Sequence, residues 1–338
     1  MISTVGDHQS TLSGIPLDDK KTPVITDIHP VIISVSRATD IPAFYFEWFL
    51  RRYKEGYIIW KNPYRQDRRQ KVYFDKTRAA VFWTKDPGSL LPYLDTLDSL
   101  SLHYYVQVTL NDYEGCGYEL QVPSLEKRIN DFQELSRRLG KHRVIWRFDP
   151  LLLSDTITPD ELFRRIKGLF SHLGPYCERM VFSFIDISGY RGVMRNMARY
   201  GLTDVREFSY DEKVLTAGVL ERCAKVYGTL VMACSQELDL SSFGIVPGRC
   251  VDDRLFRRIA EDDEEFIRWL SWGAKKDKGQ RAHCTCIVAK DVGEYSTCLH
   301  QCRYCYANRS DDVVSARNHL HLRAMSHGIL PESIVPDR

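Results

Sequence analysis

The sequence predicts an α/β protein built around a parallel β-sheet. Short runs rich in Val, Ile, Phe, Trp and Tyr recur along the 338 residues, and they look buried rather than half exposed. Each run except the last is followed by a segment whose apolar residues have helical spacing. Strands alternating with amphipathic helices favour parallel pairing through right-handed crossovers, in an open doubly wound sheet or in a complete or partial (β/α) barrel.

Six strands and five helices are expected from these patterns. The strands are the apolar runs at 31–36, 79–84, 102–110, 142–149, 179–185 and 229–234. The helices are expected at 44–56, 89–100, 124–140, 159–174 and 211–228. Residues 57–78 interrupt the repeat and predict a hairpin around an Arg-rich turn. No strand is followed by a Gly-x-Gly-x-x-Gly turn, which removes the best support for a dinucleotide-binding fold.

The composition narrows the class of protein. With 43% apolar and 12% aromatic residues the chain can bury a sizeable core. A net charge of +2 gives no global attraction to nucleic acid or to an anionic membrane, although the basic turn leaves local binding to nucleic acid open. We expect a cytoplasmic protein without membrane contact, because the sequence has no apolar run of membrane-spanning length and no signal-peptide pattern at its start.

Differences in polarity, apolar spacing and cysteine content divide the chain into three regions. Residues 1–27 are polar and aperiodic and predict a mobile N-terminal tail. Residues 28–270 hold the expected strands and helices. Residues 271–338 form a cysteine-rich segment followed by a tail, and we expect this segment to return to the ends of the strands.

Polar residues cluster where the expected strands end. Ligands of parallel α/β proteins bind at the carboxyl ends of the strands, where side chains from several strands converge. Arg147 and Asp149, for example, lie two residues apart on one face of an otherwise apolar strand. The side chains that we expect to hold a substrate are Arg37, Lys85, Arg147, Asp149, Asp186 and Glu237.

Five of the ten cysteines fall between Cys284 and Cys305, which indicates a local metal site. Cys298, Cys302 and Cys305 have the spacing Cys-x3-Cys-x2-Cys. Three thiolates on such a compact loop suit a [4Fe–4S] cluster and leave its fourth iron without a protein ligand, open for chemistry. A structural zinc normally takes four ligands, commonly from paired Cys-x2-Cys units, and only Cys302 and Cys305 have that spacing.

The segment CRYCYA, with Tyr304 before the last cysteine, resembles the motif of the radical S-adenosylmethionine (radical SAM) enzymes. The whole chain, with SRATDIP near its start and FWTKDP further on, is similar over roughly residues 30 to 308 to an uncharacterised bacterial domain-of-unknown-function family with a radical-SAM-like cluster at its C-terminus. The resemblance implies a partial (β/α)6-type barrel and a [4Fe–4S] cluster whose open iron binds SAM. It also implies that Tyr304 and Tyr306 shape the SAM pocket.

Two features depart from ordinary radical SAM enzymes. In those enzymes the three cysteines follow the first strand, whereas here they follow all six expected strands. The Gly-Gly-Glu element that usually contacts the methionyl amine of SAM comes after the second strand, and this chain has TKDP there instead.

Four further cysteines, Cys234, Cys250, Cys284 and Cys286, are enough for a second iron–sulfur cluster with a full set of protein ligands. The alternative is that they are buried or redox-inert thiols. His283 and His300 also lie beside cysteines. We assign neither as a ligand, because a lone His near a metal cluster more often supports a ligand than binds the metal.

These patterns predict an iron–sulfur protein, and the resemblance implies a radical-SAM-like enzyme that makes a 5′-deoxyadenosyl radical and acts on an unknown substrate. Such an enzyme needs an electron donor such as a ferredoxin or a flavodoxin. Two alternatives stay open. One is a non-catalytic iron–sulfur protein that transfers electrons or senses redox state, and the other is a zinc-stabilised barrel hydrolase with strand-end carboxylates.

Overall fold

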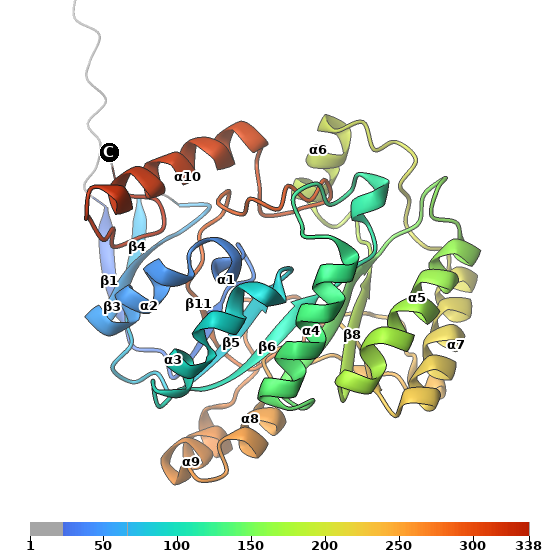
Figure 1. Cartoon of the computed structure of the whole chain (residues 1–338), viewed down its shortest axis with the longest axis horizontal. Coiled ribbons are helices and arrows are strands. Elements are labelled where there is room, and N and C mark those ends of the chain that lie inside the picture. The colour runs from blue at the N-terminus through green and yellow to red at the C-terminus, as the bar shows by residue number, and fades with distance from the viewer. Residues whose placement is uncertain (1–22, 66, 338) are drawn as a thin grey trace, which may run out of the picture.

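The computed structural model describes residues 23–65 and 67–337, and its main sheet has eight strands in the order β10-β9-β8-β7-β6-β5-β2-β11. Every neighbouring pair in this sheet is parallel, and helices surround it (Figure 1). In chain order the strands are β2 (Ile32–Val35), β5 (Ala79–Thr84), β6 (His103–Thr109), β7 (Val144–Leu151), β8 (Arg179–Phe184), β9 (Leu230–Ala233), β10 (Val246–Pro247) and β11 (Lys290–Asp291).

The predicted α/β class with a parallel sheet is confirmed, and all six predicted strands are present. The sequence patterns do not predict β10 and β11, because two residues are too few to show an apolar pattern. These two strands lie at opposite ends of the sheet and do not pair with each other in the described part of the chain. The arrangement is compatible with a barrel.

The five predicted helices are present, with two changes. The segment 44–56 is divided at Tyr45, and its second part ends at Gly56, whose φ of +90° is open to glycine at no steric cost. The segment 89–100 begins as a 3-10 helix because Pro92 lacks the N–H that an α-helix needs. The helices are α1 (Ile41–Phe44), α2 (Phe46–Glu55), α3 (Leu94–Asp98), α4 (Leu125–Leu139), α5 (Pro159–Leu173), α6 (Arg191–Arg199), α7 (Tyr210–Tyr227), α8 (Asp253–Ile259), α9 (Glu264–Gly273) and α10 (Asp311–Ser326).

The two faces of the main sheet pack against different parts of the chain. Successive strand residues point to opposite faces, so Trp146 and Ile145 of β7 enter different apolar clusters. Trp146 packs in the large cluster that contains residues of α1, α2, α4, α5 and α7. Ile145 packs in a second cluster with residues of α8 and α9, which lie at the bottom of Figure 1. We call the face that carries Ile145 the inner face.

A smaller sheet has the order β1-β4-β3 and contains the predicted hairpin. β3 (Tyr57–Lys61) and β4 (Arg68–Tyr73) pair antiparallel, which confirms the hairpin, and β1 (Val24–Ile28) pairs parallel with β4. β1 corrects the expectation of a mobile tail over 1–27 for its last residues, whereas residues 1–22 lie outside the described part of the chain.

The cysteine-rich region that we expected over 271–338 is joined closely to the rest of the structure. Its strand β11 belongs to the main sheet, and the Ile59 N–H of β3 donates to the Glu332 carbonyl at 2.7 Å. Figure 1 shows α10 lying over α2 and the smaller sheet. Among residues 23–65 and 67–337, no helix has the length and apolar character needed to cross a membrane.

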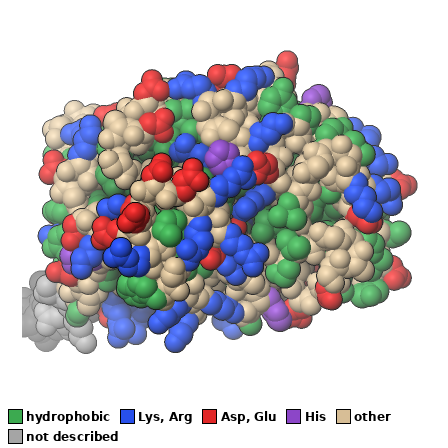
Figure 2. Space-filling model, turned by 90° about the horizontal axis from the view of Figure 1, so that it is seen from below, with side chains coloured by type: hydrophobic (Ala, Val, Ile, Leu, Met, Phe, Trp, Pro, Cys, Tyr) green, Lys and Arg blue, Asp and Glu red, His purple; other side chains and the backbone are tan. Residues whose placement is uncertain are grey.

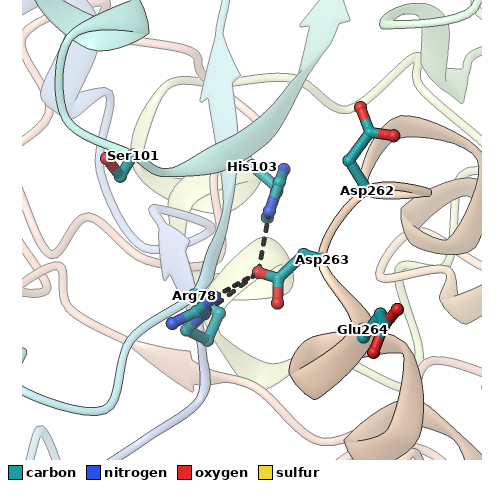
Figure 3. A pocket seen from close by; sticks show the side chains of 6 residues that line it. All are labelled: Arg78, Ser101, His103, Asp262, Asp263 and Glu264. Carbon is teal, nitrogen blue, oxygen red and sulfur yellow. Dashed lines mark hydrogen bonds and ion pairs between the residues drawn. The ribbon is translucent and has the colours of Figure 1, made fainter.

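Basic and acidic side chains are interspersed on the face seen from below (Figure 2), in keeping with the small net charge of +2. At the amino ends of β5 and β6 there is a pocket of about 420 Å³ lined by Arg78, Ser101, His103, Asp262, Asp263 and Glu264 (Figure 3). Ligands of parallel α/β proteins bind at the opposite edge of the sheet, so we interpret this pocket as a structural junction.

Asp263 is the centre of this junction. Its Oδ2 accepts a hydrogen bond from Arg78 Nη2 at 2.6 Å and lies 3.0 Å from His103 Nε2, and Figure 3 shows both side chains pointing at it. Its Oδ1 accepts a hydrogen bond from the Phe266 N–H and caps α9. The carboxylate therefore fastens α9 beneath the sheet.

Asp263→Ala removes the cap and leaves Arg78 without its buried partner, so we expect the free energy of unfolding to fall by about 1–3 kcal/mol. Burial opposes ionisation, but hydrogen bonds from Arg78, Phe266 and His103 give Asp263 a lowered pKa. Its stabilisation is therefore complete above about pH 4 and is lost as the pH falls further. Urea titrations at several pH values measure this, with the exposed Asp262→Ala as the matched control. Equal stability of the two variants would contradict the assignment.

Candidate functional site

The cysteine-rich region is anchored to the main sheet by β11. This strand pairs with β2, with Asp291 opposite Ser34. The Asp291 carboxylate accepts hydrogen bonds from the Ser34 hydroxyl at 3.0 Å, the Ser36 hydroxyl at 2.5 Å and the Arg37 N–H at 2.8 Å. β11 therefore leads the chain to the carboxyl end of β2, and the segment with the three spaced cysteines begins there.

Gly293 lets the segment after β11 approach the loop after β2 closely. A Cβ built on Gly293 would lie 1.9 Å from Ser36 Oγ and 3.1 Å from Thr39 Cγ2, so no side chain fits at this position. Residues 292–308, which we call the cysteine loop, therefore run directly against the loop that follows β2.

The three segments that carry the family resemblance meet at Asp40. Asp40 belongs to SRATDIP, and its Oδ2 accepts hydrogen bonds from the Thr84 hydroxyl at 3.0 Å and the Lys85 N–H at 2.7 Å, both in FWTKDP. His300 of the cysteine loop places its Nε2 2.7 Å from the same oxygen. The cysteine loop therefore lies at the carboxyl ends of β2 and β5, where we expected it.

A buried carboxylate supports the middle of the cysteine loop. Glu119 is fully buried, and its Oε1 accepts hydrogen bonds from Lys85 Nζ at 2.6 Å, from Asn111 Nδ2 at 3.0 Å and from the Tyr304 hydroxyl. The backbone of Glu119 also forms an isolated β-bridge with Cys302. Burial opposes ionisation of Glu119, but the Lys85 ammonium gives it a lowered pKa, so the pair is ionic. Lys85, an expected substrate ligand, is therefore bonded to Glu119 and to Tyr304 of the cysteine loop.

The three cysteines of the loop have desolvated sulfur atoms and nearby donors. Burial raises the pKa of Cys298 to about 12 and holds that of Cys302 well above its usual range. Cys305 raises the pKa of both, so the three thiols lie within electrostatic reach of one another. The Ala307 N–H donates to Cys305 Sγ at 3.3 Å. Thiols with raised pKa values are poor nucleophiles at neutral pH, whereas a bound metal deprotonates them outright.

Both ends of the cysteine loop are fixed by hydrogen bonds from other elements. The Tyr45 hydroxyl, between α1 and α2, donates to the Thr297 carbonyl at 2.7 Å. Asn196 Nδ2 of α6 donates to the Cys305 carbonyl at 2.6 Å and to the Asn308 carbonyl at 2.8 Å. α6, which the sequence patterns do not predict, thus serves to hold the end of this loop.

The residues of the loop match the ligands of an iron–sulfur cluster in type and number. Three thiols stand on one fixed loop and are desolvated, and a four-iron cube with one open iron takes three thiolates. In the part of the chain that the structure describes, no three His, Cys, Asp or Glu side chains are arranged to hold one metal ion.

Three of the residues expected to hold a substrate lie near one another. Arg147 Nη2 donates to Asp149, whose other carboxylate oxygen accepts from the Ser183 hydroxyl. The guanidinium carbons of Arg147 and Arg37 lie 5.1 Å and 6.0 Å from the centroid of the Trp83 ring. The Trp83 indole N–H is buried and has no hydrogen-bond partner among the described residues, so this place suits an acceptor group of a ligand.

Asp186 and Glu237 lie at the rim instead. Asp186 is 41% exposed, accepts a hydrogen bond from the Gly189 N–H at 2.8 Å and lies 3.7 Å from Arg281. Glu237 is 84% exposed and lies 3.3 Å from His283. The structure therefore does not bring these two carboxylates to the inner face.

The two tyrosines expected near a cofactor have different surroundings. Tyr304 is buried, and its hydroxyl is bound to Glu119. Tyr306 is 41% exposed, its hydroxyl donates to the Arg37 carbonyl at 2.8 Å, and its ring centroid lies 5.9 Å from that of Tyr190. Tyr304 thus supports the loop from within, and Tyr306 lines its open side.

The other four candidate ligands also converge, on the inner face. The sulfur atoms of Cys234 and Cys250 lie 3.8 Å apart. The Cys250 N–H donates to Cys286 Sγ at 3.2 Å, and a hydrogen bond from the Cys286 thiol lowers the pKa of Cys284 to about 7. All four cysteines that the sequence suggests for a second site are therefore neighbours.

The sequence reasoning misses Glu119, Trp83 and Asp291. Glu119 follows β6 by ten residues in a loop without a motif, so no signal points to it. Trp83 fits an ordinary apolar strand position, although it directly precedes a polar strand end. Asp291 becomes visible only through its pairing with β2, which no local pattern shows.

Comparison with known proteins identifies a family. The model of the domain of unknown function DUF1848 matches residues 32–307, a range that contains all seven candidate cysteine ligands. A putative alpha-L-fucosidase from Bacteroides thetaiotaomicron VPI-5482 has 8% identity and a TM-score of 0.28, over 93% of this chain and 98% of that chain, and this likeness carries no argument. No curated protein matches the chain. Since the family match spans most of the sequence, the chain belongs to the DUF1848 family.

Proposed function

We propose that this protein is an iron–sulfur enzyme of the radical SAM kind, with its cluster on Cys298, Cys302 and Cys305. One observation carries the proposal: β11 pairs beside β2, so the cysteine loop starts next to the first strand of the main sheet. The cysteines of ordinary radical SAM enzymes follow the first strand. Here the loop occupies a similar place although it comes from the other end of the chain.

The proposal includes a partial (β/α)6-type barrel made of β2 and β5 to β9. These six strands run parallel in chain order, and the cysteine loop lies at the carboxyl ends of the first two. This is the edge where parallel α/β proteins bind their ligands. The location therefore supports a catalytic site over a purely structural one.

The three thiolates would bind three irons of a [4Fe–4S] cluster and leave the fourth for the amine and carboxylate of SAM. Such a cluster, when bound and reduced, supplies the electron that cleaves SAM to methionine and a 5′-deoxyadenosyl radical, which abstracts hydrogen from a substrate. The chain's own part is to bind, to orient and to exclude water.

Lys85 and Glu119 have two supporting tasks in this proposal. The Lys85 ammonium opposes the rise in the pKa of Cys302 and Cys305, so it would offset the negative charge of the bound thiolates. Glu119 Oε2 is buried, lies 3.8 Å from Nη1 of the buried Arg128 and accepts no hydrogen bond within the described residues. An acceptor beside Cys302 suits the amine of SAM, which the absent Gly-Gly-Glu element contacts in ordinary radical SAM enzymes.

The substrate would lie over the inner face, between the cysteine loop and the rim. Arg37, which lies 3.6 Å from Asp291, and Asp149, which is paired with Arg147, place one charge of each sign near it, and the unpartnered Trp83 N–H offers a donor. Asp186 and Glu237 would meet it at the rim. We further propose a cytoplasmic setting, with a ferredoxin or a flavodoxin as the electron donor.

We expect anaerobically prepared protein to be brown and to contain iron and acid-labile sulfide. Joint replacement of Cys298, Cys302 and Cys305 by Ala should remove about four irons per chain. Iron and sulfide analysis measures this, and Cys116→Ala, outside both cysteine groups, is the control. Stoichiometric zinc without iron after anaerobic reconstitution would refute the proposal and favour the zinc-stabilised hydrolase.

Dithionite-reduced protein should slowly release 5′-deoxyadenosine from SAM even without substrate. The reason is that SAM on the open iron would be in contact with the reduced cluster, which supplies the electron for cleavage. SAM should also change the electron paramagnetic resonance spectrum of the reduced cluster. The triple cysteine variant, treated in the same way, should release none. If a fully loaded and reduced cluster shows neither response, the non-catalytic electron-transfer alternative is the better one.

Gly293→Ala should lower the iron content of the cysteine loop, because the added methyl group would collide with Ser36 and push the loop away from β2. We expect a loss of about 1–3 kcal/mol in stability from this overpacking. Gly168→Ala in α5, where a Cβ meets nothing within 4 Å, is the matched control and should keep its iron. Full iron content in Gly293→Ala would show that this contact does not set the loop's position.

A further inference from the structure

We propose that Cys234, Cys250, Cys284 and Cys286 hold a second iron–sulfur cluster on the inner face of the main sheet. This site shares no ligand with the cysteine loop, so it does not depend on whether that loop binds SAM. Its ligands come from three segments, one after β9, one before α8 and one before β11. Only the folded chain brings them together.

The four cysteines come together at one place on the inner face. The 3.8 Å between Cys234 Sγ and Cys250 Sγ matches the separation of about 3.8 Å expected for two thiolates on one tetrahedral iron with bonds of about 2.3 Å, which is the arrangement of a two-iron cluster, since each of its irons takes two thiolates. Cys286 accepts the Cys250 N–H at 3.2 Å, and Cys284 stands two residues before Cys286 on the same segment. Four thiolates are the protein ligand set of both common cluster types.

Close backbone contacts, rather than the thiols themselves, set these positions. A Cβ on Gly248 would lie 2.9 Å from the Ala233 carbonyl oxygen, so glycine lets the chain before Cys250 approach the end of β9. The Thr285 hydroxyl donates to the Gly248 carbonyl at 2.8 Å and ties the third segment to the second. The Tyr105 hydroxyl donates to the Cys250 carbonyl at 2.7 Å. The geometry is thus built into the scaffold before any metal binds.

Arg147 supplies the positive charge that such a site requires. Its Nη1 donates to Cys250 Sγ at 2.9 Å, and its side chain is 4% exposed. The Arg147 guanidinium has one anionic partner, the Asp149 carboxylate. Its contact with Cys250 adds little stabilisation while that thiol is neutral, because thiols are weak hydrogen-bond acceptors. Thiolates bound to a cluster are anionic, and they would give this buried cation a second partner.

These contacts argue against inert core thiols. Cys250, Cys284 and Cys286 belong to the second apolar cluster, as Cys177 belongs to the large one, so burial does not separate the two kinds of thiol. They differ in their polar contacts, because Cys250 lies against Cys234, Cys286 and the Arg147 guanidinium. A cavity of about 320 Å³ is bordered by Cys284, Arg249 and Lys276, so the site also has an access route for metal.

The test uses the full chain in which Cys298, Cys302 and Cys305 are replaced by Ala. After anaerobic reconstitution with iron and sulfide, this variant should retain about two or four irons per chain, depending on the cluster type, and show iron–sulfur absorption. Adding Cys284→Ser and Cys286→Ser should remove that iron. Adding Cys116→Ser and Cys223→Ser instead should leave it in place.

Circular dichroism shows which variants are folded, and iron content is compared only among these. Absence of iron from the folded triple variant would overturn the second cluster and leave the first untouched. Zinc bound in place of iron in that variant would overturn it as well. Iron in the triple variant but not in its Cys284, Cys286 derivative would support it, whatever the outcome with SAM.

Arg147→Gln gives an independent readout in the same background. Loss of a positive charge against Cys250 makes reduction of the cluster less favourable, so its midpoint potential should shift to a more negative value. Arg147→Lys, which keeps the charge but not the fork geometry, should shift it less. An unchanged potential in Arg147→Gln would show that this guanidinium does not face a redox centre.

Discussion

The pairing of β11 with β2 is the constraint on which the rest of the site depends. It joins residues 257 positions apart in the sequence through one carboxylate, that of Asp291. The hydroxyls and the N–H that bind this carboxylate would otherwise need other partners, so moving β11 costs several hydrogen bonds at once. Because the cysteine loop begins at the residue after Asp291, this contact sets the position of the loop.

The route of the chain explains how Cys250, Cys284 and Cys286 reach the inner face. After β10 the chain passes beneath the sheet through α8 and α9, whose apolar residues cover the lower part of the inner face. It then returns upward to β11. Cys250 lies where this excursion starts, and Cys284 and Cys286 lie where it ends. The upper part of the face is left to Arg147, Asp149 and their partners.

The sequence predicts the strands well because each is an apolar run buried on both faces. It also shows the cysteine spacing, which is local. It does not show β11, which has two residues and is held by Asp291, or Glu119, whose role comes from contacts with Lys85 and Tyr304. The contact between Cys234 and Cys250 likewise depends on the packing of Gly248 against Ala233, which the spacing of apolar residues in the sequence does not show. Local patterns give the elements and the ligand types, and tertiary contacts decide which ligands meet.

An anaerobic crystal structure with anomalous scattering at the iron edge tests the central claim most directly. The account predicts an iron–sulfur cluster at the carboxyl ends of β2 and β5, bound to Cys298, Cys302 and Cys305 and with one iron free of protein ligands. Iron bound elsewhere with these three thiols free, or a zinc ion in their place, would contradict it.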